Sequence, residues 1–290
     1  MVFLLTFAFY SGPNYRFLLF NHSSNSISYN SNLQNLVHNT SLGDIQFLVV
    51  GSSMSLNDIS GAMLEDSLKC KVYNLSSWGF RSDKILGFFS KVKLANCKTV
   101  VMGFNNIDFG INAGATYDFG LSDSYLNGAG CDRICGFIRT FNFLEFNDAF
   151  LQRKSSAVRN DQYFALGFDR HGSVLLDTPG FKIDAYRWGH TTDTLGFGIF
   201  LKNVTALKDL LRSKNIRLWI AYLPYRRDVI TPELRNHDDA VTQTLRNALA
   251  DNFIDLHDVT VPKDFYADVS HMFKPGAEFI TSTIIDSIRR

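Results

Sequence analysis

The sequence has few cysteines, almost no net charge and no long hydrophobic run. Its 290 residues include four cysteines without a Cys-x-x-Cys pair, so a zinc ribbon or a thioredoxin-like motif is not expected. The formal net charge of +1 creates no overall field that would attract nucleic acid or an anionic membrane. A glycine-rich phosphate loop, a His-Glu-x-x-His motif and a calcium-binding loop are also missing, so we expect no cofactor and no metal site.

The cysteines do not indicate a disulfide. Cys70 and Cys97 each precede a predicted strand. If these two strands flank a third, the thiols are roughly 10 Å apart, which is too far for a bridge. Cys131 and Cys135 could face each other on a helix or close a small loop, although buried or free thiols are the simpler interpretation.

The first 43 residues are expected to form an apolar segment and a linker. Residues 2–10 are apolar, but Pro13 and polar residues interrupt the run before it reaches the roughly 20 residues that span a bilayer. No basic segment precedes the run, so a standard signal peptide is a poor match. The segment could be the remains of an anchor, a signal segment or an element packed on the domain. Residues 21–39 are rich in Ser and Asn, which favours a linker.

From residue 44 onward, strands and helices alternate. The Val- and Ile-rich strands predict a parallel sheet covered by helices on both faces. We therefore expect one α/β domain over residues 44–290, with a three-layer, flavodoxin-like α/β/α sheet of five strands in the order 2-1-3-4-5. The expected strands are 45–50, 71–75, 99–102, 217–223 and 252–257, and the expected helices are 56–68, 82–92, 195–213, 232–249 and 275–288.

The alternation stops at residues 107–193. Within this insertion, the pattern predicts a helix over 132–152 and a hairpin over 167–176 with its turn at 169–172. A loop of this length without structure of its own would be unusual. We expect a lid or small subdomain that shapes the cleft.

The first predicted strand ends in a turn of small residues, Gly51-Ser52-Ser53, and Asn57 or Asp58 could cap the helix that follows. In open parallel sheets, ligands bind at the carboxyl ends of the strands. A hydroxyl there lies near backbone N–H groups at a helix start, where a nucleophilic serine is useful. Taken alone, the stretch is better explained by a turn without chemistry, because small polar turns are common.

Three other polar clusters follow strands on the same predicted edge. Taken singly, they are explained as loops, turns or helix caps, but their joint placement favours a catalytic site. The clusters are Ser76-Ser77-Trp78-Gly79, Gly103-Phe104-Asn105-Asn106 and Asp268-Val269-Ser270-His271.

With these four segments the chain resembles the SGNH (GDSL-like) hydrolases, which carry Ser, Gly, Asn and His in four blocks. The resemblance covers roughly residues 44–106 and 195–290, with departures at Ser52 and Asn106, where the family usually has Asp. Its Gly-Ser-Ser block resembles proteins that add or remove acyl groups on bacterial surface polysaccharides. The resemblance implies a serine esterase or O-acyltransferase acting on acyl, chiefly acetyl, esters of a glycan. Together with the apolar amino end, it implies an extracytoplasmic protein (periplasmic, secreted or membrane-anchored), with membrane association through that segment.

The chemistry gives each residue a role. Ser53 is the preferred nucleophile because it takes the third position of its block, and Ser52 is the alternative one residue away. His271 can take and return the hydroxyl proton, and Asp268 is close enough in sequence to hold the imidazole. The oxyanion would be bound by three donors: the backbone N–H groups of Ser53 and Gly79 and the side-chain amide of Asn105.

Other polar residues are weaker candidates. Arg226 and Arg227 follow the fourth strand at the active edge and could contact the substrate, as could His190 from the insertion. His171 and Asp169 are expected to lie in a solvated turn rather than in a site.

Two other functions stay open. The domain could be a catalytically silent glycan-binding or polysaccharide-assembly protein, because a fold does not imply a function. It could also bind a phosphate or nucleotide, with the turn at residues 51–53 as an anion nest. A separation of roughly 3–4 Å between Ser53 Oγ and the His271 ring would favour catalysis.

Overall fold

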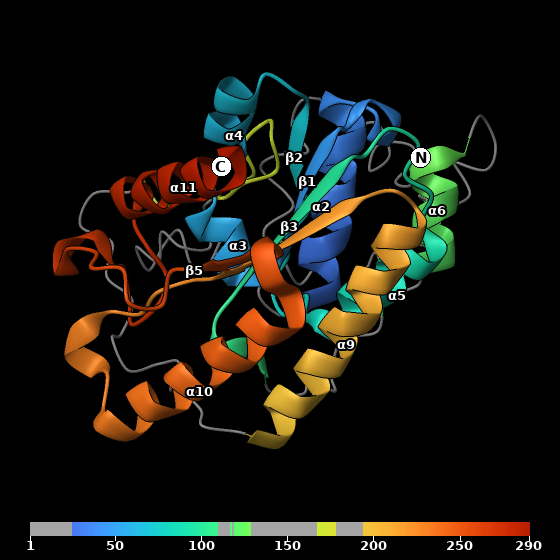
Figure 1. Ribbon diagram of the computed structural model, residues 1–290. Coiled ribbons are helices and arrows are strands. Elements are labelled where there is room, and N and C mark those ends of the chain that lie inside the picture. Colours follow the sequence, from blue (N-terminus) through green and yellow to red (C-terminus); the bar gives the residue numbers. More distant parts are fainter. Residues whose placement is uncertain (1–24, 110–116, 118, 129–166, 178–193) are drawn as a thin grey trace.

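A five-stranded parallel sheet forms the centre of the molecule (Figure 1). The computed structural model describes residues 25–109, 117, 119–128, 167–177 and 194–290. The sheet has the order β2-β1-β3-β4-β5, so the predicted three-layer, flavodoxin-like topology is confirmed. Its strands are β1 (Phe47–Gly51), β2 (Val72–Asn74), β3 (Thr99–Phe104), β4 (Arg217–Tyr222) and β5 (Phe253–Asp255).

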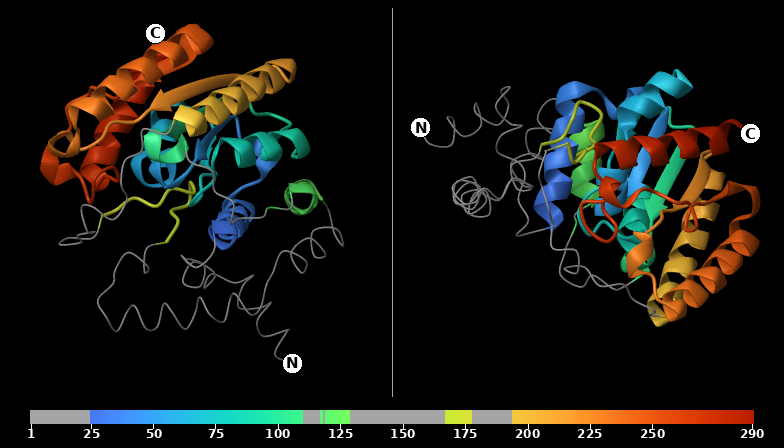
Figure 2. Two further views of the ribbon diagram at one scale, coloured as in Figure 1. Left: turned by 90° about the horizontal axis from the view of Figure 1, so that it is seen from below. Right: turned by 90° about the vertical axis from the view of Figure 1, so that its left-hand side faces the viewer.

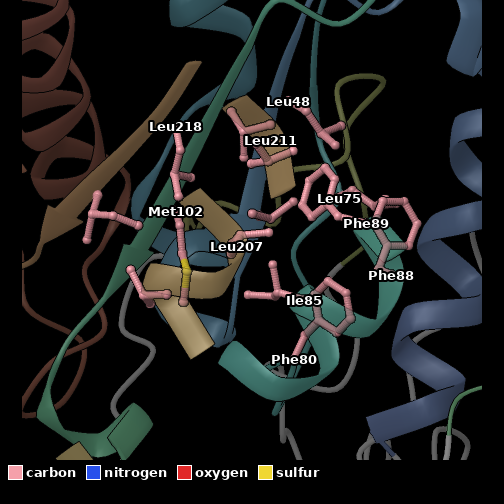
Figure 3. Packing of buried hydrophobic residues seen from close by; sticks show 14 of the residues in the cluster. Leu48, Leu75, Phe80, Ile85, Phe88, Phe89, Met102, Leu207, Leu211 and Leu218 are labelled. Carbon is pink, nitrogen blue, oxygen red and sulfur yellow. The ribbon is translucent and has the colours of Figure 1, made fainter. Parts of the chain in front are cut away.

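Both faces of the sheet are buried, which explains why its strands are apolar without alternation. On β1, Leu48 and Val50 belong to one hydrophobic cluster, and Phe47 and Val49 belong to the other. Figure 3 shows the first cluster, where side chains of the sheet meet those of two helices. The labelled residues are Leu48, Leu75, Phe80, Ile85, Phe88, Phe89, Met102, Leu207, Leu211 and Leu218.

Helices cover each face of the sheet, as Figures 1 and 2 show. One face packs against α3 (Ser53–Asp58), α4 (Gly61–Leu68) and α11 (Lys274–Arg289), drawn to the left of the sheet in Figure 1. The other face packs against α2 (Asn25–Asn39), α5 (Ser82–Lys91), α6 (Phe119–Asn127), α9 (Thr194–Ser213) and α10 (Pro232–Leu249). None of the helices in the described part of the chain combines the length and apolarity needed to cross a bilayer.

The predicted linker is wrong for residues 25–39, which form α2. Tyr29, Leu33 and Leu36 of this helix are buried in the core. The polar residues that suggested a linker bond to the rest of the protein. Asn32 Nδ2 donates to the carbonyl oxygen of Asn74, at 2.9 Å, and to that of Ser76. Asn32 therefore serves as a hydrogen-bond donor to buried backbone carbonyl groups, not as a turn former.

The insertion is described in three parts: the 3₁₀ turn η3 (Asn106–Phe109), α6 and residues 167–177. The predicted turn at 169–172 is present, with Asp169 N donating to Ser173 O at 2.8 Å. The predicted hairpin ladder is not formed, because the segment pairs with the body of the domain. Asn74 N donates to His171 O at 2.7 Å, and Val174 N donates to Leu56 O at 3.0 Å. The predicted helix at 132–152 lies outside the described residues.

Cys70 and Cys97 are both free thiols in the structure. They precede β2 and β3, which flank β1 in the sheet. Cys131 and Cys135 lie outside the described residues.

Candidate active site

The turn after β1 is shaped by Gly51, whose φ of 151° is rarely adopted by other residues. A Cβ atom at this position would lie 2.2 Å from Ser55 Oγ and 2.6 Å from Gly103 O. Ser52 then caps α3 by accepting a hydrogen bond from Met54 N. This cap makes Ser53 the first residue of α3, at the carboxyl edge of the sheet. The helix caps therefore differ from the prediction, because Ser52 and Ser60 cap α3 and α4 in place of Asn57 or Asp58.

Ser53, His271 and Asp268 form one chain of hydrogen bonds. Ser53 Oγ lies 2.9 Å from His271 Nε2, and His271 Nδ1 lies 2.6 Å from Asp268 Oδ2. Asp268 Oδ1 also accepts the backbone N–H groups of Ser270 and His271, which fixes the carboxylate. With Nδ1–H donating to Asp268, Nε2 is left to accept the serine proton. The serine–histidine distance meets the criterion stated for catalysis and disfavours a nucleotide site, which would leave His271 remote from the turn.

The electrostatics of this pair suit a base that becomes charged. Burial opposes ionisation of Asp268, but the adjacent imidazole and backbone N–H groups lower the pKa of its carboxyl. Burial likewise opposes the charged form of His271, but the Asp268 carboxylate outweighs it and raises the pKa of His271 to about 9. An imidazolium formed by proton transfer from Ser53 would therefore be stabilised where it forms.

Asn105 is held so that its amide N–H groups are available. The residue is fully buried at the end of β3, and its Oδ1 accepts the N–H of Ile107 at 3.1 Å. Its Nδ2 has no hydrogen-bond partner among the residues described. Unpaired buried donors are uncommon and call for an explanation. A role in binding an oxyanion would provide one.

The other two predicted oxyanion donors lie on neighbouring turns. Ser53 N belongs to the first turn of α3, where a backbone N–H has no acceptor within its own helix. Gly79 has a φ of 62°, in the left-handed region that favours glycine. The turn before it is tied to the end of β1, because Ser77 N donates to Gly51 O at 3.0 Å.

Ser52 and Ser53 have different surroundings, which separates the two candidate nucleophiles. Ser52 is buried, caps α3 and donates to the Asp108 carboxyl, whereas the half-buried Ser53 reaches His271. Asp108 was not identified from the sequence. Its Oδ2 accepts the N–H of Asn105 at 3.1 Å, and burial raises the pKa of its carboxyl. The signal in the sequence was an acidic residue three positions after Asn105.

Of the residues predicted to contact the substrate, two form hydrogen bonds within the protein and the third lies outside the described residues. Arg226 Nε bonds to Asp228 Oδ1 at 2.7 Å, and the Arg227 guanidinium donates to the carbonyl of Asp258. His190 lies outside the described residues. Their contact with a substrate stays a prediction.

The turn at Asp169 and His171 is not solvated as predicted. His171 is buried, and its Nε2 lies 3.7 Å from Glu65 Oε1. Asp169 Oδ1 accepts the N–H groups of His171 and Ser173, which closes the turn against β2.

One group of described residues brings metal-ligating atoms together. The ligand atoms of Asp239, His257 and Asp258 all lie within 4.8 Å of one another. His257 Nδ1 is also 2.6 Å from Asp255 Oδ1, so the imidazole is the centre of an ion-pair network. His257 pairs with the carboxylates of Asp239, Asp255 and Asp258 in this network.

The fold and the Ser53–His271–Asp268 chain together have the geometry of an α/β serine hydrolase site. No protein-family model matches the chain, and no curated protein matches it. Solved structures are similar to it, and two of them share 10% sequence identity with it. One is a protein from Desulfitobacterium hafniense assigned to the G-D-S-L family of lipolytic proteins, with a TM-score of 0.44 over 83% of this chain and 98% of that one. The other is a carbohydrate esterase whose active site is described as having divergent catalytic and non-catalytic binding functions, with a TM-score of 0.41 over 85% of this chain and 69% of that one.

Proposed function

We propose that the protein is a serine esterase or O-acyltransferase that acts on acyl esters, chiefly acetyl esters, of a glycan. The observation that carries the proposal is the continuous chain from Ser53 Oγ through the His271 ring to Asp268, with separations of 2.9 and 2.6 Å. A serine hydroxyl is a weak nucleophile near neutral pH unless a base within hydrogen-bond reach takes its proton. Here His271 supplies the base, and the Asp268 carboxylate orients it.

The first half of the proposed reaction transfers the acyl group to the enzyme. Ser53 Oγ attacks the ester carbonyl carbon while its proton passes to His271 Nε2. The negative charge on the carbonyl oxygen is then bound by the N–H groups of Ser53, Gly79 and Asn105. Collapse of this intermediate breaks the bond to the leaving alkoxide, which takes the proton from His271 and departs as an alcohol.

The second half returns the enzyme to its starting state. A water molecule or a sugar hydroxyl gives its proton to His271 and attacks the acyl-Ser53 carbonyl. The second tetrahedral intermediate expels Ser53 Oγ, which regains the proton from His271. Water as acceptor makes the protein an esterase, and a sugar hydroxyl makes it an acyltransferase. The choice depends on how well the site excludes water.

The glycan substrate and the location rest on the sequence. The Gly-Ser-Ser block at residues 51–53 resembles that of proteins that modify surface polysaccharides, and residues 2–10 are apolar. We infer an extracytoplasmic protein from these two features. Fusion of residues 1–43 to a reporter that is active only after export tests the location, and a reporter retained inside the cell contradicts it.

The function is tested by intact-mass labelling with a serine-directed fluorophosphonate. Wild type should gain a single adduct, and Ser53→Ala and His271→Ala should gain none. Ser52→Ala is the matched control, because it removes the adjacent hydroxyl and should still be labelled. A panel of acetylated glycans would then identify the substrate. No adduct on folded wild type would contradict catalysis and favour the silent glycan-binding protein.

A further inference from the structure

A buried carboxyl outside the triad connects α3 to the loop that carries His271. Asp58 is the last residue of α3, and its side chain is fully buried. Its Oδ1 accepts the backbone N–H of Met272, the neighbour of His271, at 2.8 Å. Its Oδ2 has no hydrogen-bond partner in the described part of the structure. Buried carboxyls of this kind are rare, so a specific role is expected.

The hydrogen bond between Asp58 and Met272 N matters because Asp58 lies on the same helix as Ser53. The helix has six residues and a length of about 9 Å at a rise of about 1.5 Å per residue. Ser53 is its first residue and Asp58 is its last. The nucleophile and the acceptor for the Met272 N–H therefore belong to one short rigid element. A shift of α3 would carry both groups together.

The backbone of the His271 loop, residues 266–273, has several other attachments, but none of them is to α3. The loop folds back on itself, where Ala267 N donates to His271 O at 2.8 Å. It meets other parts of the chain where Arg226 N donates to Val269 O and where Phe273 pairs with Leu176 in an isolated parallel bridge. Among the hydrogen bonds of the described residues, the one that Met272 N donates to Asp58 Oδ1 and the one between Ser53 Oγ and His271 Nε2 make that connection.

We propose that Asp58 is a positioning residue that holds the Met272 N–H and thereby keeps the His271 ring within hydrogen-bond reach of Ser53 Oγ. Its effect on catalysis rests on the proposed function, whereas the contact itself does not. The carboxyl works here as a hydrogen-bond acceptor. Burial raises the pKa of Asp58 well above its usual range, so a neutral group with the same acceptor should replace it.

The test compares two substitutions of similar shape. Asp58→Asn keeps an oxygen that can accept the Met272 N–H, whereas Asp58→Leu removes the acceptor and keeps the branched shape. We expect Asp58→Asn to be labelled by the fluorophosphonate at close to the wild-type rate. Asp58→Leu should be labelled about a hundredfold more slowly, because a displacement of about 1 Å in a catalytic group can cost that much. Hydrolysis of a chromogenic acetyl ester should show the same loss in kcat, with KM little changed.

A control substitution separates positioning from general stability. Ser60 N, two residues beyond Asp58, donates to Thr281 Oγ1 of α11 at 2.9 Å. Thr281→Val removes this bond on the same side of the domain without touching Met272. It should lower the melting temperature and leave the labelling rate of the folded protein unchanged. If Asp58→Leu does not fold, Asp58→Ala removes the acceptor without adding volume.

A second readout does not depend on catalysis. The proton on His271 Nδ1, shared with Asp268, should give a downfield NMR resonance that His271→Ala removes. This resonance should stay in place in Asp58→Asn and shift or broaden in Asp58→Leu, while the corresponding signal of His257 is unchanged in both. An unlabelled wild type with these NMR changes would contradict the proposed function and support the placement of Asp58. Unchanged resonance and labelling in folded Asp58→Leu, or equal losses in Asp58→Asn and Asp58→Leu, would overturn the proposal.

Discussion

Two histidines in this protein are each held by an aspartate at the same distance, yet their settings differ. His271 Nδ1 lies 2.6 Å from Asp268, and His257 Nδ1 lies 2.6 Å from Asp255. The difference is at the other ring nitrogen. His271 Nε2 meets the hydroxyl of Ser53, whereas His257 Nε2 lies 3.3 Å from each of two carboxylates, those of Asp239 and Asp258.

The comparison shows that an Asp–His pair is not by itself a catalytic feature. The carboxylates of Asp239 and Asp258 are exposed, and with Asp255 they surround the His257 ring and favour its charged form. His271 instead faces the transferable proton of the Ser53 hydroxyl. The third group, not the pair, determines what the imidazole can do.

The largest expected difference comes from changing the aspartate of each pair. Asp268→Asn should lower kcat about 10⁴-fold, because the amide no longer favours the imidazole tautomer that accepts the serine proton. Asp255→Asn makes the same change beside His257 and should leave kcat unchanged. Ester hydrolysis by the two purified variants measures both. Similar losses in the two variants would mean that the second histidine also takes part in the reaction.

The second-largest effect on catalysis is expected at Asn105, one of the proposed oxyanion donors. Asn105→Ala should lower kcat by about 10²–10³-fold, the usual cost of removing one oxyanion donor. KM should change little, because the bond strengthens only when charge develops on the substrate oxygen. Steady-state kinetics on an acetyl ester separates the two constants. A rise in KM at constant kcat would show that Asn105 binds the ground state instead.

The pH dependence should move activity and stability in opposite directions. Neutral His271 is needed as the base, so kcat/KM should rise about tenfold per pH unit and level off near the pKa of His271, about 9. This folded-state pKa lies above the ordinary histidine value of 6.5, so the stability it contributes is complete below pH 6.5 and is lost as the pH rises to about 9. Urea unfolding of wild type and His271→Ala across this range measures the second effect. A flat kcat/KM profile above pH 6.5 contradicts the assignment.

The smallest effect on catalysis is expected at His257. His257→Gln removes a partner of Asp255 and Asp239 and should cost about 1–3 kcal/mol of unfolding free energy. Catalysis per folded molecule should be unchanged. Burial opposes the charged ring, but Asp255 raises the pKa of His257, so its contribution to stability is present below pH 6.5 and fades at higher pH. Denaturant titration of wild type and His257→Gln at pH 6 and pH 9 tests this. A loss of unfolding free energy that is larger at pH 9 than at pH 6 would contradict the prediction.

The parallel sheet and the proximity of Ser53, His271 and Asp268 could be predicted because both follow from the local sequence pattern. Apolar strands such as 47–50 end abruptly in small or polar residues, and parallel strands bring those ends to one edge. The choice of Ser53 over Ser52 could be made from its place in the block. The roles of these side chains in a reaction stay a prediction until they are tested.

What could not be predicted depends on contacts between distant parts of the chain. The Ser- and Asn-rich composition of residues 25–39 gives no sign that Asn32 will bond to Asn74, 42 residues away. Asp58 has the local pattern of a helix cap, and its contact with Met272 spans 214 residues. Composition and periodicity record which face of an element is apolar, but not which polar group will meet a backbone N–H from elsewhere.

The crowding around Gly51 limits how this site could be re-engineered. A Cβ at Gly51 or Gly103 would lie 2.2 or 2.6 Å from Ser55 Oγ, which itself donates to Gly103 O at 2.8 Å. Gly51, Ser55 and Gly103 are therefore closely packed against one another, so saturation mutagenesis at these three positions would mostly produce inactive clones. A library meant to change the preferred ester should keep these three residues constant and vary other residues around the site.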